Sequence, residues 1–179
     1  MLAKIYIVGP VGSGKSTLAR RISREFGHTH CEMDGVVYEP YAASSSGNRK
    51  RTEADRDALI GGVLASPAWV MEDAGRPAFE YLWEAADAII FLDLPVSVRK
   101  RRIVLRWIKQ RLHLERCSYK PDWVMLKLMF KWTQNFEDGI DTLRARLVRF
   151  GDKVIRLRTS RDVNRYVDGL SKADGRLKT

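Results

Sequence analysis

The sequence predicts an α/β protein built on a doubly wound, five-stranded parallel sheet. Short apolar runs typical of buried strands alternate with longer segments whose apolar residues recur at helical spacing. A glycine-rich segment follows the first apolar run directly and leads into the first helical pattern. Strands separated by helices in this way favour a parallel sheet with helices on both faces. The length of 179 residues suits one domain, residues 1–179, with a single core.

The first strand is expected at residues 5–8, and the segment that follows it reads G-x-x-x-x-G-K-S. Positions without side chains let backbone N–H groups surround a phosphate at the start of a helix. In this pattern Lys15 reaches the terminal phosphates of a nucleotide, and the Ser16 hydroxyl contacts Mg²⁺. A tight turn without a ligand is the alternative, but the flanking strand and helix favour a phosphate-binding loop. The expected nucleotide-binding residues are Gly9, Gly12, Ser13, Gly14, Lys15, Ser16 and Thr17.

The segment after this loop places one acidic residue at the end of a strand. A helix is expected at residues 15–26, with Gly27 ending it, and a second strand at residues 30–33. Asp34 comes just past that strand, and the carboxyl ends of parallel strands line the ligand crevice. Asp34 is therefore a candidate to orient a substrate hydroxyl or a metal-bound water. Capping of the following turn is the alternative.

The next segment contains a polar stretch and a second strand end. Residues 39–52 are rich in Pro, Ala, Ser, Gly and Asn, which predicts a loop that serves as a substrate flap. A helix at 53–64 and a strand at 69–71 are expected next. Glu72 and Asp73 follow that strand, where Glu72 can hold the hydration shell of a bound Mg²⁺. Two solvated turn carboxylates are the alternative.

The second half of the chain alternates in the same way. A buried strand is expected at residues 88–92, and a long basic helix follows Pro95. Residues 123–136 and 140–148 have helical patterns as well. The expected C-terminal elements are a strand at 153–157, a helix at 162–170 and a polar, frayed tail at 171–179.

A net charge of +10 indicates an anionic partner such as a nucleotide, a nucleic acid or a phosphorylated metabolite. The charge gathers between residues 99 and 120, where nine basic residues face one acidic residue. Arg102 and Arg106 lie one helical turn apart on the same face, so together they can clamp a polyphosphate. The basic residues for which a solvated helical face is the better interpretation are Lys100, Lys109 and Arg116.

Composition also bears on where the protein works. No apolar run approaches the about 20 residues that cross a bilayer, so we expect no membrane association. Cys31 and Cys117 are far apart in the sequence, and neither has the spacing of a metal or redox motif. We expect free thiols in a reducing compartment, which favours a cytoplasmic protein. The sequence carries no signature of an oligomeric state.

Four segments, in order along the chain, carry a family resemblance. They are GPVGSGKSTLAR at residues 9–20, MDGVVYEP at 33–40, WVMED at 69–73 and ADAIIFLDLP at 86–95. With them, the chain resembles the adenylate-kinase-like P-loop kinases and, among these, the group called DNA topology modulation proteins. The resemblance implies a sheet of the P-loop nucleotide-kinase type, with a helical lid inserted after the fourth strand around residues 99–136. It also implies ATP and Mg²⁺ as ligands.

The same resemblance implies roles for individual residues. Glu72 is followed four positions later by Arg76, which matches the arginine that holds the acceptor phosphate. Arg102 and Arg106 match two lid arginines that contact the nucleotide and the transferring phosphoryl group, where negative charge develops. Asp73 departs from the family, which often has glycine there. The lid also lacks the glycines and the zinc or proline-rich features of larger adenylate kinases, so the phosphate acceptor stays open.

Two functions from different classes are consistent with these residues. The first is a kinase that transfers phosphate from Mg-ATP to a small acceptor, a nucleotide or a nucleoside. Its expected catalytic residues are Lys15, Asp34, Arg102 and Arg106, its acceptor-binding residues are Asp34, Glu72 and Arg76, and its metal-binding residues are Ser16 and Glu72.

The second is a regulator of DNA topology, in which ATP gates the contact of residues 99–131 with DNA. Trp107, Trp123 and Trp132 lie in or near this region and could stack on bases. Tryptophans at helical positions are more often core residues, and no dedicated nucleic-acid-binding motif is visible. The kinase is therefore the favoured interpretation.

Overall fold

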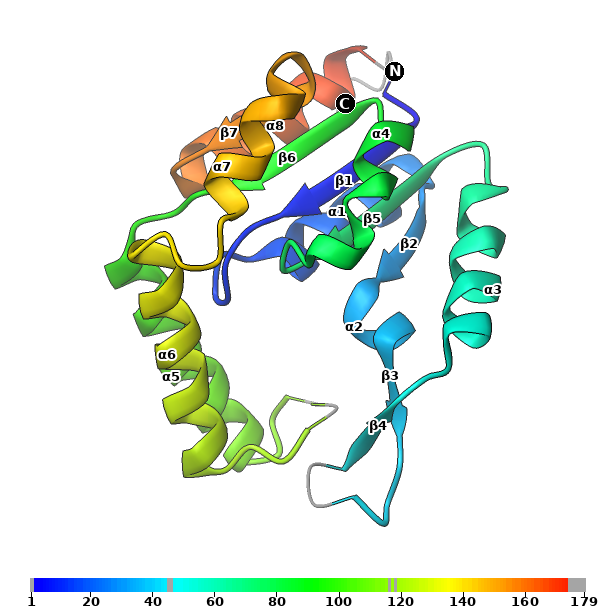
Figure 1. The fold of residues 1–179 in the computed structure, drawn as a ribbon. Coiled ribbons are helices and arrows are strands. Elements are labelled where there is room, and N and C mark those ends of the chain that lie inside the picture. Colours follow the sequence, from blue (N-terminus) through cyan, green and yellow to red (C-terminus); the bar gives the residue numbers. More distant parts are fainter. Residues whose placement is uncertain (1, 45–46, 116, 118, 174–179) are drawn as a thin grey trace.

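The computed structural model describes residues 2–44, 47–115, 117 and 119–173. A five-stranded sheet forms its centre, with strands in the order β2-β5-β1-β6-β7 (Figure 1). All four pairs of neighbouring strands are parallel, which confirms the predicted fold class. The strands are β1 (Lys4–Val8), β2 (Thr29–Glu32), β5 (Trp69–Asp73), β6 (Ala88–Leu92) and β7 (Val154–Leu157).

Helices cover both faces of this sheet because its central strands are apolar on both sides. In β1, Tyr6 and Val8 point into one buried cluster, whereas Ile5 and Ile7 point into the other. The helices α1 (Lys15–Phe26) and α8 (Ser160–Ala173) pack on the Ile5 side. The helices on the Tyr6 side include α3 (Glu53–Leu64), α4 (Tyr81–Ala85) and α7 (Leu143–Leu147).

Some predicted boundaries coincide with the structure, and others are shifted by one to three residues. The helix α1, the helix α3 and the strand β6 have the predicted bounds, and Gly27 ends α1 with a φ of 77°. The strand β5 continues to Asp73, two residues beyond its predicted end. Glu72 and Asp73 are thus buried strand residues rather than solvated turn carboxylates.

The segment predicted as a loop at 39–52 contains regular structure. A short helix α2 (Met33–Val37) leads into an antiparallel hairpin of β3 (Tyr38–Pro40) and β4 (Asn48–Lys50). Glu39 forms ion pairs with Arg49 and Arg51, at 2.6 and 2.7 Å, and these join the two sides of the hairpin. The prediction of a loop was therefore wrong at both ends of this segment, and residues 45–46 lie outside the described part of the chain.

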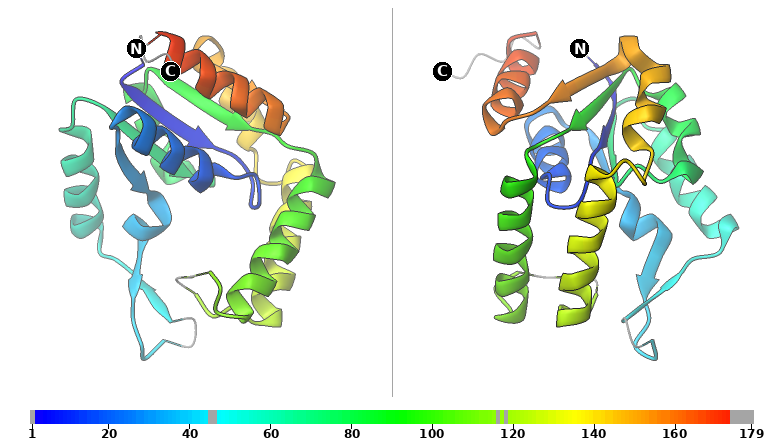
Figure 2. Two further views of the ribbon diagram at one scale, coloured as in Figure 1. Left: turned by 180° about the vertical axis from the view of Figure 1, so that it is seen from behind. Right: turned by 60° about the vertical axis from the view of Figure 1, so that its left-hand side comes forward.

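Two long helices form the lid that was predicted after the fourth strand. The helices α5 (Val96–Arg111) and α6 (Trp123–Glu137) pack along each other around Ile103, Leu126 and Met129. Figures 1 and 2 show both helices extending away from the carboxyl end of the sheet, on the opposite side from the β3–β4 hairpin. Arg116 lies outside the described residues.

The C-terminal part follows the predicted order with shifted bounds. The region predicted as helical at 140–148 consists of α7 and a 3₁₀ helix η2 (Val148–Lys153). The 3₁₀ helix η1 (Pro77–Phe79) and α4 were not predicted. The helix α8 continues to Ala173, and residues 174–179 of the predicted tail lie outside the described part. No helix among the described residues is long and apolar enough to cross a membrane.

Candidate active site

The loop between β1 and α1 requires glycine for its shape. Gly12 and Gly14 have φ values of 76° and 98°, in the left-handed region that side chains disfavour. A Cβ atom on Gly12 would lie 2.8 Å from the carbonyl oxygen of Arg99, so the loop also packs against the first turn of α5 too closely for a side chain. The spacing of the sequence motif thus follows from backbone shape.

The N-terminus of α1 is left without a cap. No side chain caps it at Gly14, and its first turn contains no acidic residue. Free N–H groups and the helix dipole give this end a partial positive charge that favours a phosphate. The buried Ser13 hydroxyl also has no hydrogen-bond partner among the described residues. These features fit a bound nucleotide phosphate.

Lys15 lies near three carboxylates, those of Glu72, Asp34 and Asp73. Its Nζ donates to the carbonyl oxygen of Pro10 at 3.3 Å. Burial lowers the pKa of Lys15, and the nearby carboxylates of Glu72, Asp34 and Asp73 act in the opposite direction. Glu72 and Asp73 end β5, and Asp34 lies in α2 directly after β2, so the topology brings the predicted residues to one edge of the sheet.

Glu72 is the buried acid beside the phosphate loop. Its residue exposure is 4%, and burial raises its pKa, while Lys15 and a hydrogen bond with Ser16 act to lower it. Its Oε1 has no partner among the described residues. The part of the chain that the structure describes also holds no group of three His, Cys, Asp or Glu side chains suited to a metal. A Mg²⁺ at this place would therefore take most of its ligands from water and nucleotide phosphates, as Mg²⁺ commonly does, with Ser16 and Glu72 nearby.

Arg76 joins two acids on the acceptor side of the loop. Its guanidinium donates to Asp34 in α2 and to Asp73 at the end of β5. The Asp73 side chain is fully buried, and its Oδ2 also accepts from the backbone N–H groups of Gly75 and Arg76, at 2.9 and 2.6 Å. The Asp34 side chain is 61% exposed. Asp73 thus fixes Arg76, and Arg76 in turn holds the exposed carboxylate of Asp34.

The two lid arginines differ in their surroundings. Arg102 donates to the carbonyl oxygen of Ser13 at 2.9 Å and to the hydroxyl of Ser160 at 3.2 Å, so it braces the phosphate loop. Arg106 donates to the sulfur of Met129 at 3.6 Å, and its charge is close enough to lower the pKa of Lys15. Its guanidinium forms no ion pair within the described residues. The structure therefore brings both arginines to the loop but leaves only Arg106 uncommitted.

Several known proteins are similar to this chain in sequence or in fold. No family model matches the chain. It is 24% identical over 147 residues to the uncharacterised protein YqaC of Bacillus subtilis strain 168, covering 82% of this chain and 79% of that protein. A shikimate kinase from Acinetobacter baumannii, solved in complex with shikimate, has a TM-score of 0.56 at 17% identity over 99% of this chain and 97% of that one. A gluconokinase from Sinorhizobium meliloti 1021 has a TM-score of 0.50 at 18% identity, over 96% and 97%.

The strand order and these similarities decide the architecture. The chain has the P-loop kinase fold. At 17% and 18% identity the similarity concerns the fold and does not identify a substrate. The narrower resemblance to DNA topology modulation proteins stays a prediction from the sequence.

One arginine at the base of the lid has a role that the sequence did not reveal. Arg99 is fully buried, donates to the carbonyl oxygen of Leu94 at 3.0 Å, and pairs with Glu137 at the end of α6. Its guanidinium also lies 5.1 Å from the centre of the Phe136 ring. In this P-loop kinase fold Arg99 therefore joins the two lid helices where they meet the phosphate loop. Its sequence environment is that of a surface charge, so no local signal could have identified it.

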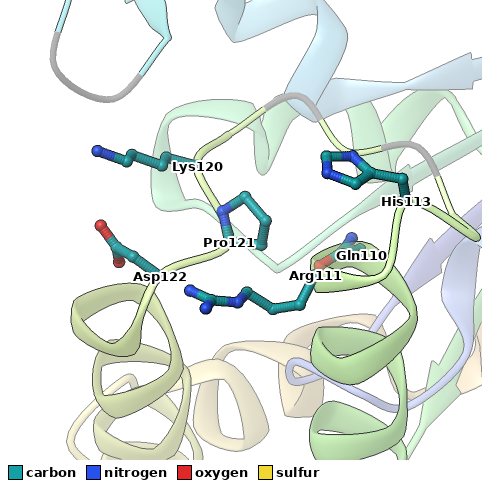
Figure 3. A pocket seen from close by; sticks show the side chains of 6 residues that line it. All are labelled: Gln110, Arg111, His113, Lys120, Pro121 and Asp122. Carbon is teal, nitrogen blue, oxygen red and sulfur yellow. The ribbon is translucent and has the colours of Figure 1, made fainter.

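A pocket of about 330 Å³ opens at the far end of the lid (Figure 3). Arg111 follows Arg99 by twelve residues of helix, or about 18 Å, so this pocket is separate from the phosphate loop. Trp107 lies nearby, with its ring centre 4.5 Å from that of Trp123. The residues that line the pocket are Gln110, Arg111, His113, Lys120, Pro121 and Asp122.

Proposed function

We propose that this protein is a kinase that transfers the terminal phosphoryl group of Mg-ATP to a hydroxyl group of a small acceptor. One observation carries the proposal: the Asp34–Arg76–Asp73 cluster lies at the same sheet edge as Lys15 and the uncapped end of α1. A nucleotide-binding loop alone would suit any ATP-binding protein. An exposed, oriented carboxylate beside it suits an enzyme that positions an acceptor.

On the nucleotide side, each residue has a task that its surroundings support. The free N–H groups of α1 and the Lys15 ammonium would hold the phosphates. Ser16 and Glu72 would hold Mg²⁺ directly or through its water shell, and the metal would neutralise charge on the phosphate oxygens. Arg106 would stabilise the charge that develops on the transferring group. Arg102 would keep the loop in shape through Ser13.

On the acceptor side, Asp34 is the residue that would meet the reacting hydroxyl. Its exposed carboxylate can accept a hydrogen bond from that hydroxyl, and later its proton, while Arg76 fixes the orientation of the carboxylate. We propose a nucleoside or nucleotide as the first acceptors to test, because the sequence resembles kinases of that kind. The solved neighbours are named for shikimate and gluconate, so small hydroxyl compounds come next.

The direct test is a phosphotransfer screen. The purified chain is incubated with Mg-ATP and single acceptors drawn from nucleosides, nucleoside monophosphates, sugars and small hydroxy acids. We expect at least one acceptor to raise ADP release well above the acceptor-free rate, and Asp34→Asn to abolish that increase while ATP binding persists. ADP release that no acceptor changes, with ATP bound normally, would contradict the proposal.

A second candidate function is supported by exposed side chains of α6. Trp123 and Trp132 are 61% and 46% exposed, and Lys127 and Lys131 are exposed as well. Exposed basic and aromatic side chains can bind nucleic acid by charge and stacking. Trp107 contributes less, because it is half-buried and donates to the carbonyl oxygen of Asp122 at 3.0 Å. Nucleic-acid binding thus stays an alternative, and its salt dependence distinguishes it from kinase activity.

A further inference from the structure

Three arginines near the proposed acceptor site are paired with carboxylates among the described residues. Arg76 pairs with both Asp34 and Asp73. Arg51, which approaches the carbonyl oxygen of Gly35 in α2, pairs with Glu39 at 2.7 Å. A third arginine closes the other side of the cluster: Arg146 donates to the carbonyl oxygen of Gly75 and pairs with Glu80 at 3.1 Å.

The pairing of Arg76 is difficult to undo. The Asp73 carboxylate is fully buried, whereas the Arg76 side chain is 28% exposed. If Arg76 turned to an incoming phosphate or carboxylate, a buried negative charge would lose its main cationic partner. Breaking a buried ion pair by removing one partner is strongly unfavourable. Arg76 is therefore poorly available to an anionic acceptor.

The other charged side chains at the carboxyl edge of the sheet are either carboxylates or cations that would bind the phosphates of ATP. Asp34 and Asp73 carry two negative charges and Arg76 carries one positive charge, so the cluster has a net charge of −1. Lys15 and Arg106 form no ion pair within the described residues, but both face the phosphates in the proposed reaction. A second anion bound between Asp34 and the phosphates of ATP would meet like charges on both sides.

From this arrangement we infer that the acceptor is an electrically neutral polyhydroxyl compound, such as a nucleoside or a sugar, and that anionic acceptors are selected against. The inference rests on the proposed function, because it concerns the acceptor of that reaction. Asp34 would recognise a hydroxyl by accepting a hydrogen bond from it, which an ionised carboxylate or the dianion of a phosphate ester cannot donate. The assignment therefore differs from the prediction that Arg76 holds an acceptor phosphate.

The first test compares acceptors that differ in charge alone. The pairs are adenosine and AMP, cytidine and CMP, glucose and gluconate, and glycerol and glycerol 3-phosphate, each with Mg-ATP. We expect the neutral member of every reactive pair to have a kcat/KM at least about tenfold higher. Equal rates, or faster reaction of the anion in any pair, would overturn the inference while leaving kinase activity established.

The second test needs no acceptor and stays decisive if no pair reacts. Inorganic phosphate is titrated by calorimetry into the protein saturated with a non-hydrolysable ATP analogue and Mg²⁺. We expect no saturable binding to the parent protein and saturable binding to Asp34→Asn, in which one bond from Arg76 is released. The exposed Asp57→Asn change in α3 is the control and should have no effect. Two results would overturn the inference, whether or not the protein proves to be a kinase. One is phosphate binding by the parent that the Arg76→Gln change abolishes, and the other is phosphate binding that is no stronger in Asp34→Asn than in the parent.

Discussion

Glu72 is a buried carboxyl at the candidate site, and its charge affects the stability of the folded protein. Burial raises the pKa of this carboxyl, so the folded protein binds the proton more tightly than the unfolded chain does. The protonated carboxyl stabilises the folded protein relative to the ionised one. This contribution is fully present below about pH 4.3, the pKa of the carboxyl in the unfolded chain, and it is lost as the pH rises through the higher pKa of the carboxyl in the folded protein. At neutral pH the ionised side chain therefore reduces the free energy of unfolding.

Replacing Glu72 with Gln should stabilise the protein at pH 7 and impair phosphotransfer. A gain of about 1 kcal/mol would raise the Tm by about 2–4 °C, and the gain should vanish below about pH 4, where the parent is protonated too. Thermal unfolding at pH 7 and pH 4 measures this, with the exposed Glu84→Gln as the control. A gain of equal size at both pH values would show that the charge of Glu72 is not its cause.

Replacing Arg106 and replacing Arg102 should have different effects on kcat and on ATP binding. The Arg106→Ala change removes a charge with no ion pair in the described structure, so kcat should fall on the order of 100-fold while the Kd for ATP changes little. The Arg102→Ala change removes the bond to the Ser13 carbonyl and should weaken ATP binding as well as lower kcat. The exposed Lys109→Ala is the matched control in α5. Unchanged kcat in Arg106→Ala would make Arg106 a surface charge.

At the scale of elements, the lid depends on a charged junction at its base. Arg99 of α5 is fully buried, and Glu137 of α6 is its carboxylate partner. Glu137→Ala would leave the Arg99 guanidinium buried without this partner and should lower the free energy of unfolding by about 2–4 kcal/mol. Urea denaturation measures the loss, and Asp138→Ala, one residue further along and exposed, should change it by less than about 1 kcal/mol. Equal effects of the two changes would mean that the junction is not a structural element.

The elements that were predicted well are those that pack through apolar periodicity. The strand β6 and the helix α3 have patterns that local sequence determines, and both have the predicted bounds. The strand β5 extends further because Glu72 and Asp73 pair in register with Ile7 and Val8 of β1, which the polar composition of β5's end does not reveal. The β3–β4 hairpin has little apolar content, so the pairing of Glu39 with two arginines, rather than hydrophobic patterning, joins its two sides.

The sequence could predict the part of the candidate site in which the spacing of residues along the chain determines what they bind. The phosphate loop follows from its glycines, and the edge position of Asp34 follows from the strand before it. The pairing of Arg76 with Asp34 joins residues 42 positions apart, so it depends on the fold and not on any local pattern. The burial of Arg99 was hidden for the same reason, because it contacts Phe136 and Glu137 of α6, far along the sequence.

At the scale of the whole molecule, some of the basic side chains behind the net charge of +10 are paired with carboxylates. Arg99, Arg144 and Arg156 are matched to buried or half-buried carboxylates. The cations that stay exposed on the two lid helices are Lys100, Arg101, Lys109, Arg111, Lys127 and Lys131. They make weak, non-specific DNA binding an expected property of this surface whatever the protein does.

Salt dependence therefore separates the two candidate functions better than affinity does. For a kinase, we expect DNA binding to disappear near physiological salt, with log K falling by about 0.9 per phosphate contact for each unit of log salt. Mg-ATP should compete with DNA for the arginines of the lid. A DNA titration at two salt concentrations, with and without Mg-ATP, measures both effects. Tight binding that resists salt and responds to ATP by a definite change in affinity would favour the regulator.

The proposed reaction moves a phosphoryl group from ATP to a small acceptor at the carboxyl edge of the sheet. It can be followed with the label of γ-radiolabelled ATP in reactions with the acceptor panel, comparing the parent with Lys15→Ala and with the exposed Lys100→Ala as control. We expect a labelled acceptor product in the parent and in Lys100→Ala, and none in Lys15→Ala, whose thermal unfolding should stay close to that of the parent. Label found only in inorganic phosphate, or a product that forms equally well without Lys15, would contradict the proposed reaction.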